Sequence, residues 1–145
     1  MTNIASRLRT EEHSEEWLRE RLDYMTQFLT EERKLTLRRT VEQRTHYMRI
    51  MTENMFHPQN ASAIMRHCEA FGIQQIHCVE DRCKFDPSVN IVRGTQKWVD
   101  VEHHETTAEA LSALKSEGYR IVATTPRRWS STPESFDVTK GKFAL

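Results

Sequence analysis

In the first third of the chain, apolar residues recur at intervals of three and four, the spacing of helices with one apolar side. Ser14 can cap a first helix, in which the acidic first turn is followed by a periodic apolar stripe. The apolar positions of this helix are Leu18, Leu22, Met25 and Leu29. Thr30 repeats the start signal before a shorter helix in which Leu37 and Val41 form an i,i+4 apolar pair. The pattern predicts two amphipathic helices.

From Tyr47 the pattern changes. Short apolar runs, typical of strands, flank one segment in which the apolar residues have helical spacing. A strand is expected to end at the turn-forming residues 56–59, and Asn60 is expected to cap the helix that follows. This helix should bury Ala61, Ile64, Met65, Cys68 and Phe71. Gly72 is a typical left-handed stop, and Ile73–Val79 has the composition of a strand buried on both faces. Strand, helix and strand predict a right-handed parallel crossover.

The same order of elements recurs in the second half of the chain. Lys97–His103 is predicted as a strand, Thr106–Glu117 as a helix and Tyr119–Thr124 as a further buried strand. A polar loop rich in Ser, Thr and Pro is expected over residues 126–140. Lys142–Leu145 then begins another apolar run, and we expect the natural chain to continue beyond it. The predicted fold class is α/β with a parallel sheet.

Composition narrows the class of protein but gives no partner. Basic and acidic residues number 21 each, so the net charge is zero and any nucleic-acid signal must come from local clusters. The three cysteines show no Cys-x-x-Cys spacing, and no secretory segment precedes them, which favours a reduced, cytoplasmic protein. No apolar run approaches the roughly 20 residues of a membrane span. We expect a soluble protein of one main domain.

Two local clusters suggest chemistry and leave alternatives open. The second predicted helix and the residues after it are rich in the cations Arg33, Lys34, Arg38, Arg39 and Arg44. Such a run indicates either a solvated helix face or a surface that binds nucleic-acid phosphates. A second cluster contains the potential zinc ligands His67, Cys68, His77, Cys78 and Cys83. Their spacing does not match a zinc site, so no metal is expected.

Three ordered segments carry a resemblance to a known family. Residues 57–72 read HPQNASAIMRHCEAFG, residues 94–99 read GTQKWV and residues 119–125 read YRIVATT. In this order they resemble segments of the SpoU-type RNA ribose 2'-O-methyltransferases, most of all the TrmH tRNA enzymes. The resemblance implies a SPOUT-type, Rossmann-like domain of the α/β-knot class. It further implies a helical RNA-binding extension over residues 1–46 and an incomplete methyltransferase domain over residues 47–145, ending before the knot.

The family's reaction transfers a methyl group from S-adenosylmethionine to a ribose 2'-hydroxyl. The resemblance places Asn60 and Arg66 in catalysis, and it implies a tRNA substrate with guanosine 18 of the D-loop as the target. Because a guanidinium stays protonated, Arg66 is better suited to clamp a phosphate and stabilise a developing alkoxide than to act as a base. Without the resemblance, Asn60 would be an ordinary helix cap and Arg66 a surface residue paired with Glu69. Gln59 stands where the family often has His.

The resemblance also assigns the binding residues and partners. It implies that tRNA is held by Arg33, Lys34, Arg38, Arg39, Arg44 and Lys97. For the cofactor, only Thr124 and Thr125 are candidate contacts, since the Gly-rich and Asn-containing motifs of the family are expected beyond Leu145. We therefore expect these 145 residues alone not to bind S-adenosylmethionine measurably, and the intact protein to be a homodimer. Two alternatives stay open: a truncated or non-catalytic RNA-binding module, and a ribosomal RNA 2'-O-methyltransferase.

Overall fold

The structure of the chain is a computed structural model that describes residues 13–126 and 131–145. The chain divides into two compact units, one that extends to Glu42 and one formed by Gln43–Leu145. Among the described residues, no helix combines the length and the apolar character needed to cross a membrane.

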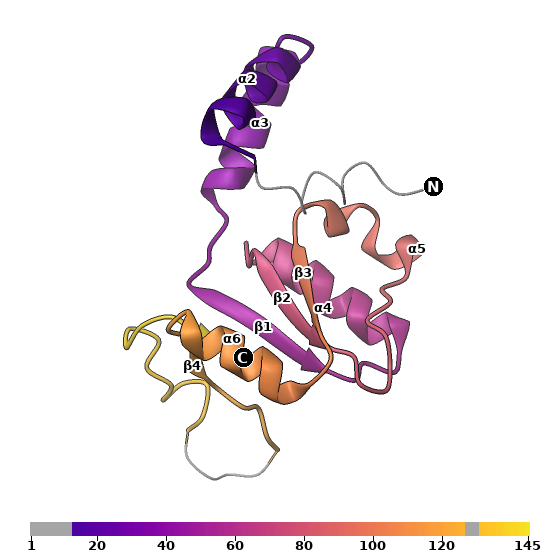
Figure 1. The fold of residues 1–145 in the computed structure, drawn as a ribbon, viewed down its shortest axis with the longest axis vertical. Helices are drawn as coiled ribbons and strands as arrows, with labels where there is room; N and C mark the ends of the chain where they lie inside the picture. The colour runs from indigo at the N-terminus through magenta and orange to yellow at the C-terminus, as the bar shows by residue number, and fades with distance from the viewer. Residues whose placement is uncertain (1–12, 127–130) are drawn as a thin grey trace. The chain divides into compact units, whose positions relative to one another are not determined.

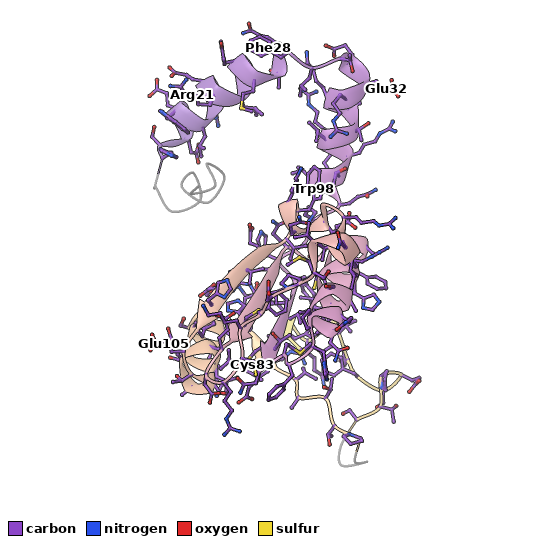
Figure 2. All side chains as sticks on the ribbon, turned by 90° about the vertical axis from the view of Figure 1, so that its right-hand side faces the viewer. Arg21, Phe28, Glu32, Cys83, Trp98 and Glu105 are labelled. Carbon is purple, nitrogen blue, oxygen red and sulfur yellow. The ribbon has the colours of Figure 1, made fainter. Side chains whose placement is uncertain are left out.

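The first unit contains the two helices that the apolar spacing predicts, α2 (Glu15–Thr26) and α3 (Glu31–Glu42). Ser14 caps α2 by accepting a hydrogen bond from the backbone N–H of Trp17 at 3.2 Å, and the Thr30 hydroxyl accepts one from Arg33 at 3.3 Å. Neither helix buries a residue. Figure 2 shows the side chains of this unit, including the labelled Phe28, projecting from the helices. Of the predicted apolar positions, Leu18, Leu22, Met25 and Val41 are exposed, whereas Leu37 and Leu29, which lies after the end of α2, are half-buried.

Within the described residues of the second unit, five strands form one parallel sheet in the order β3-β2-β1-β5-β4 (Figure 1). The strands are β1 (Met48–Glu53), β2 (Gln75–Val79), β3 (Asp100–His104), β4 (Arg120–Ile121) and β5 (Phe143–Ala144). The terminal apolar run becomes β5, which lies between β1 and β4. The predicted parallel α/β architecture is confirmed.

Helices α4 (Pro58–Ala70) and α6 (Thr107–Ser116) cover opposite faces of the sheet (Figure 1). Adjacent residues of a strand point to opposite faces, and in β1 Ile50 packs into the α4 core whereas Met51 packs into the α6 core. The buried residues of the α4 core are Ala61, Met65, Cys68, Ile73, Ile76, Cys78, Phe85, Val92 and Val99. The smaller α6 core contains Leu114, Tyr119 and Ala144.

Parallel strands place all their carboxyl ends at one edge of the sheet, where ligands bind in open α/β folds. Trp98 precedes β3, whereas Cys83 and Glu105 follow β2 and β3 along the chain. Figure 2 shows Trp98 at one end of this unit and the other two at the opposite end. The carboxyl edge is therefore the end marked by Cys83 and Glu105.

Helix α4 differs from the prediction at both of its ends. His57 is the N-cap and Pro58 occupies the first turn, so the expected capping role of Asn60 is wrong. Proline is favoured there because its fixed φ suits a helix and its missing N–H would be unpaired in any case. Phe71 lies past the last helical residue and is 75% exposed, so its predicted place in the core is also wrong.

The segment between β2 and β3 contains two short elements that the apolar pattern does not predict. They are the helix α5 (Val89–Val92) and the 3-10 turn η1 (Thr95–Lys97). The predicted strand from residue 97 accordingly begins later, at Asp100. Elements of four and three residues are too short to produce a helical period in the sequence.

Gly72 has the left-handed conformation expected of it, with φ of 71°, and it also allows a close backbone approach. A Cβ at this position would collide with the carbonyl oxygen of Gln43. The chain entering this unit is held here by two hydrogen bonds, from Thr45 N–H to the Gly72 carbonyl at 2.7 Å and from Gln74 N–H to the Thr45 carbonyl at 3.1 Å. Gly72 thus joins residues 43–45, the entry segment of this unit, to the end of α4.

Candidate functional site

Arg66 is an exposed residue of α4 that faces the short helix α5. Its Nη1 donates a hydrogen bond to the carbonyl of Ile91 at 3.2 Å. No ion pair joins it to Glu69 in the described part of the chain, which removes the argument for a simple surface pair. A guanidinium has five N–H groups, so one protein contact orients Arg66 and leaves donors for a ligand.

Asn60 lies in the first turn of α4, which follows the carboxyl end of β1. Its side chain is exposed and makes no hydrogen bond with any described residue. Six positions along an ideal helix separate two residues by about 9 Å of rise and by about 120° around the axis. The structure therefore does not bring Asn60 against Arg66, and any joint action would have to occur through a bound substrate.

The predicted RNA-binding cations occupy different surroundings. Arg33, Arg38 and Arg39 are exposed on α3, while Lys34 pairs with Glu31 at 2.7 Å and lowers the pKa of that carboxyl. Lys97 is exposed at the end of η1 in the second unit. Of these cations, Arg33, Arg38, Arg39 and Lys97 are therefore exposed, whereas Lys34 is half-buried and ion-paired.

Arg44 is placed differently because its guanidinium is used inside the second unit. It donates to the Gln74 side chain at 2.9 Å and to the carbonyls of Ile73, Trp98 and Glu69 at 2.9, 2.6 and 3.3 Å. These acceptors come from α4, from the two residues before β2 and from the segment before β3. The arrangement favours a structural clamp over the predicted phosphate contact.

Two hollows meet near the carboxyl ends of β4 and β5. The first has a volume of 430 Å³ and is bordered by β1 and α4, with Ile50, Ile64 and Phe71 in its lining. The second has a volume of 680 Å³ and is lined by both Thr124 and Thr125. Thr124 and Leu145 border both hollows. The two candidate cofactor residues therefore lie at a concave surface of ligand size.

A buried histidine pair lies on the opposite face of the sheet, under α6. His77 is 0% exposed and His104 5%, and Nδ1 of His77 lies 3.0 Å from Nε2 of His104. Arg49, also buried, donates from Nη1 to Nε2 of His77 at 3.3 Å and forms a two-pronged ion pair with Glu117 at 2.8 Å. Because Arg49 can only donate, Nε2 of His77 must accept, and the proton of that ring belongs on Nδ1, which donates to His104.

The geometry of this pair also bears on metal binding. His77, His104 and Glu102 offer ligand atoms within 4.8 Å of one another, a set that sequence spacing does not reveal. A metal would need the lone pair of His77 Nδ1, the atom to which the Arg49 contact assigns a proton. The arrangement thus favours hydrogen bonding over metal binding, and the expectation of no metal stays a prediction. Cys68 and Cys78 are separately buried, and burial raises the pKa of their thiols to about 11 and about 12.

We predict that the buried pair makes stability depend on pH. Burial is the main cause that lowers the pKa of His77; Glu102 opposes it, and Arg49 adds to it. The folded protein therefore keeps this ring neutral while the unfolded chain binds a proton below about pH 6.5. The contribution of the neutral His77 ring to the free energy of unfolding is complete above that pH, and it is lost as the pH falls through the folded-state pKa. Melting temperatures measured from about pH 7.5 to about pH 5 should fall.

The variant His77→Gln should show a flatter pH dependence, whereas His57→Gln, at an exposed site, should keep the dependence of the parent. The charged groups facing the pair are Arg49 of β1, Glu102 of β3, Glu109 of α6 and Glu117, which directly follows α6. Equal slopes for the parent and His77→Gln would contradict the prediction.

The chain is similar to a known protein family and to several named relatives. A family model described as the SpoU rRNA Methylase family matches residues 47–145. A Borreliella burgdorferi protein named tRNA (guanosine(18)-2'-O)-methyltransferase is 32% identical over 104 residues, which are 72% of this chain and 48% of that protein. A Thermus thermophilus protein of the same name is 30% identical over 111 residues, covering 77% of this chain and 57% of its own.

Among solved structures, the crystal structure of the A. aeolicus TrmH/SpoU tRNA modifying enzyme matches with a TM-score of 0.57 and 30% identity. The match covers 65% of this chain and 48% of that one. The chain thus spans about half the length of these relatives.

Proposed function

Because the chain belongs to the SpoU methylase family, we propose that the protein to which it contributes methylates the 2'-hydroxyl of a tRNA ribose, with guanosine 18 as the target. The names of the relatives support the choice of substrate. The observation that carries the proposal is Arg66, exposed on the first helix after β1 and oriented by the carbonyl of Ile91.

For this reaction the protein mainly has to stabilise charge and to position the reacting groups. A ribose hydroxyl is a weak nucleophile, so the site must stabilise negative charge as its proton leaves. Arg66 remains protonated, and its planar fork can hold a phosphate and face a developing alkoxide together. Asn60, exposed in the first turn of the same helix, is proposed to contact the RNA.

S-adenosylmethionine, when bound, would supply an activated methyl group. The hollow of 680 Å³ fits a part of its cradle, since Thr124 and Thr125 offer hydroxyls at the carboxyl edge of the sheet. Thr124 also borders the hollow against α4. We propose that these threonines form one wall of the cofactor site and that residues beyond Leu145 supply the rest.

The exposed cations of α3 are proposed to hold the tRNA backbone, since phosphate contacts give affinity and position without reading sequence. Arg44 is left out of this surface because its guanidinium is bound internally.

We predict that replacing both Arg38 and Arg39 with glutamine weakens tRNA binding most at low salt. Each lost phosphate contact should reduce the slope of log affinity against log salt by about 0.9, so the double variant should lose about 1.8. Filter binding at four salt concentrations gives the slope. Arg82→Gln, which removes a cation paired with Asp81 in the second unit, is the control and should leave the slope unchanged. An unchanged slope in the double variant would remove α3 from the RNA surface.

The proposed activity is tested by labelled methyl transfer from S-adenosylmethionine to unmodified tRNA transcripts, using the full-length protein. A transcript already methylated at guanosine 18 should accept no further label. Transfer to ribosomal RNA but not to tRNA would favour the ribosomal alternative. Tight tRNA binding without any transfer would instead identify a non-catalytic RNA-binding module.

A further inference from the structure

The segment between β2 and β3 brings cations to the same side of the domain as Arg66. From Pro87 to Val99 the sequence has no acidic residue and contains Arg93 and Lys97. Its short elements α5 and η1 both pack against α4, the helix that carries Arg66. The segment therefore carries two cations alongside the helix that contains Arg66.

This segment is held firmly at its start. The hydroxyl of Ser62, which is 0% exposed, donates to the Pro58 carbonyl at 2.6 Å and accepts from the Ser88 N–H at 2.8 Å. Three residues later, the carbonyl of Ile91 accepts the hydrogen bond from Arg66. Both contacts anchor α5 to α4.

The middle of the segment is held by the burial of Val92 and by hydrogen bonds within the segment. Val92 is 1% exposed in the α4 core, and its carbonyl accepts from the Thr95 hydroxyl at 2.9 Å. The Gly94 N–H donates to the Gln96 side chain at 2.9 Å. Arg93 therefore projects from a backbone that is fixed on both sides, which lowers the entropy lost when its side chain binds a ligand.

Arg93 itself adopts an unfavourable backbone conformation. Its φ of 48° and ψ of 34° are left-handed, and glycine is the residue that usually occupies this place at a helix end. Asn54 is the other non-glycine residue with positive φ in the described chain, and its side chain accepts a hydrogen bond from the Arg82 N–H at 2.9 Å. The Arg93 side chain is exposed and has no such contact with a described residue. The folded structure alone offers no reason for an arginine here.

We propose that Arg93 is an RNA-binding residue that contacts a backbone phosphate beside the one held by Arg66. This inference rests on the proposed function. It adds an RNA contact from outside residues 57–72, the segment that contains Asn60 and Arg66. A planar guanidinium on a fixed loop suits two-pronged binding of a phosphate, and Arg93 forms no ion pair with any residue that the structure describes.

The variant Arg93→Gly separates binding from structure, because glycine relieves the left-handed strain while it removes the charge. We expect its melting temperature to equal or exceed that of the parent. Its tRNA affinity should fall about tenfold at low salt, the scale of one charged hydrogen-bonded contact, and its salt slope should fall by about 0.9. Arg93→Lys should keep most of the salt slope and lose part of the affinity. Arg82→Gln serves as the matched loss of a paired surface cation.

The outcomes distinguish this inference from the proposal on which it rests. Normal tRNA affinity in Arg93→Gly, together with weakened binding in the α3 double variant, would overturn the role of Arg93 alone. A lower melting temperature in Arg93→Gly would show that the residue serves the fold, which also overturns the inference. Failure of the parent protein to bind tRNA would overturn both.

Discussion

Replacing Arg66 with lysine is expected to lower the single-turnover rate of methyl transfer by roughly 10²–10³, equivalent to the loss of about 2.7–4 kcal/mol of transition-state stabilisation. Lysine keeps the positive charge but loses the planar fork that can hold phosphate and hydroxyl together. The fold should be retained, because Arg66 is exposed and makes a single hydrogen bond, to Ile91. Rates measured at saturating tRNA, beside binding isotherms, separate the chemical step from affinity.

The matched control is Arg82→Lys, a surface arginine of the same unit that pairs with Asp81. It should leave both rate and affinity unchanged. If Arg66→Lys retained a rate close to that of the parent, Arg66 would be only a brace between α4 and α5, and its catalytic assignment would have to be abandoned.

Gly72→Ala is expected to destabilise the second unit by more than about 3 kcal/mol. A left-handed conformation costs an L-residue about 1–2 kcal/mol, and the new Cβ would in addition collide with the backbone of Gln43. Relief of that collision requires the entry segment to move, which would disturb the hydrogen bond from Thr45 to Gly72 and the clamp formed by Arg44. Urea denaturation followed by circular dichroism measures the free energy of unfolding.

Gly118→Ala separates the two contributions, because Gly118 also has positive φ, 81°, but a Cβ there would meet only the end of the flexible Lys142 side chain at 3.7 Å. It should cost about 1–2 kcal/mol, the conformational part alone. Equal losses in the two variants would show that the approach of Gln43 to Gly72 contributes nothing to stability.

Much of the fold could be predicted from the sequence because its signals are local. Ser14 and Thr30 mark helix starts through hydroxyls that reach a backbone N–H three residues later. Gly72 marks a helix end through a conformation that few other residues adopt readily. The strands β2 and β5 follow the apolar runs that predict them, whereas β3 has Val101 as its one apolar residue, and of the predicted buried strand Tyr119–Thr124 only Arg120–Ile121 forms β4, with Ile121 exposed.

The features that the sequence did not predict depend on contacts between residues that lie far apart in the chain. Nothing near Arg44 in the sequence indicates that its guanidinium reaches the Trp98 carbonyl, so a basic run was interpreted as one RNA surface. His77 meets His104 only because β2 and β3 pair in a register that sets His77 beside Glu102. Spacing along one segment carries no information about register between two strands.

The central position of β5 has a consequence for the order of folding. Phe143 and Ala144 are the partners of β1 on one side and of the two-residue β4 on the other. During synthesis, β1, β2 and β3 can pair as soon as residue 104 has left the ribosome, but one edge of β1 stays open until residues 143–145 emerge. Contacts of such sequence separation slow folding, and an unpaired apolar edge favours aggregation. Nascent chains arrested before residue 143 should therefore bind chaperones that recognise extended apolar segments, and release from them should coincide with the emergence of β5.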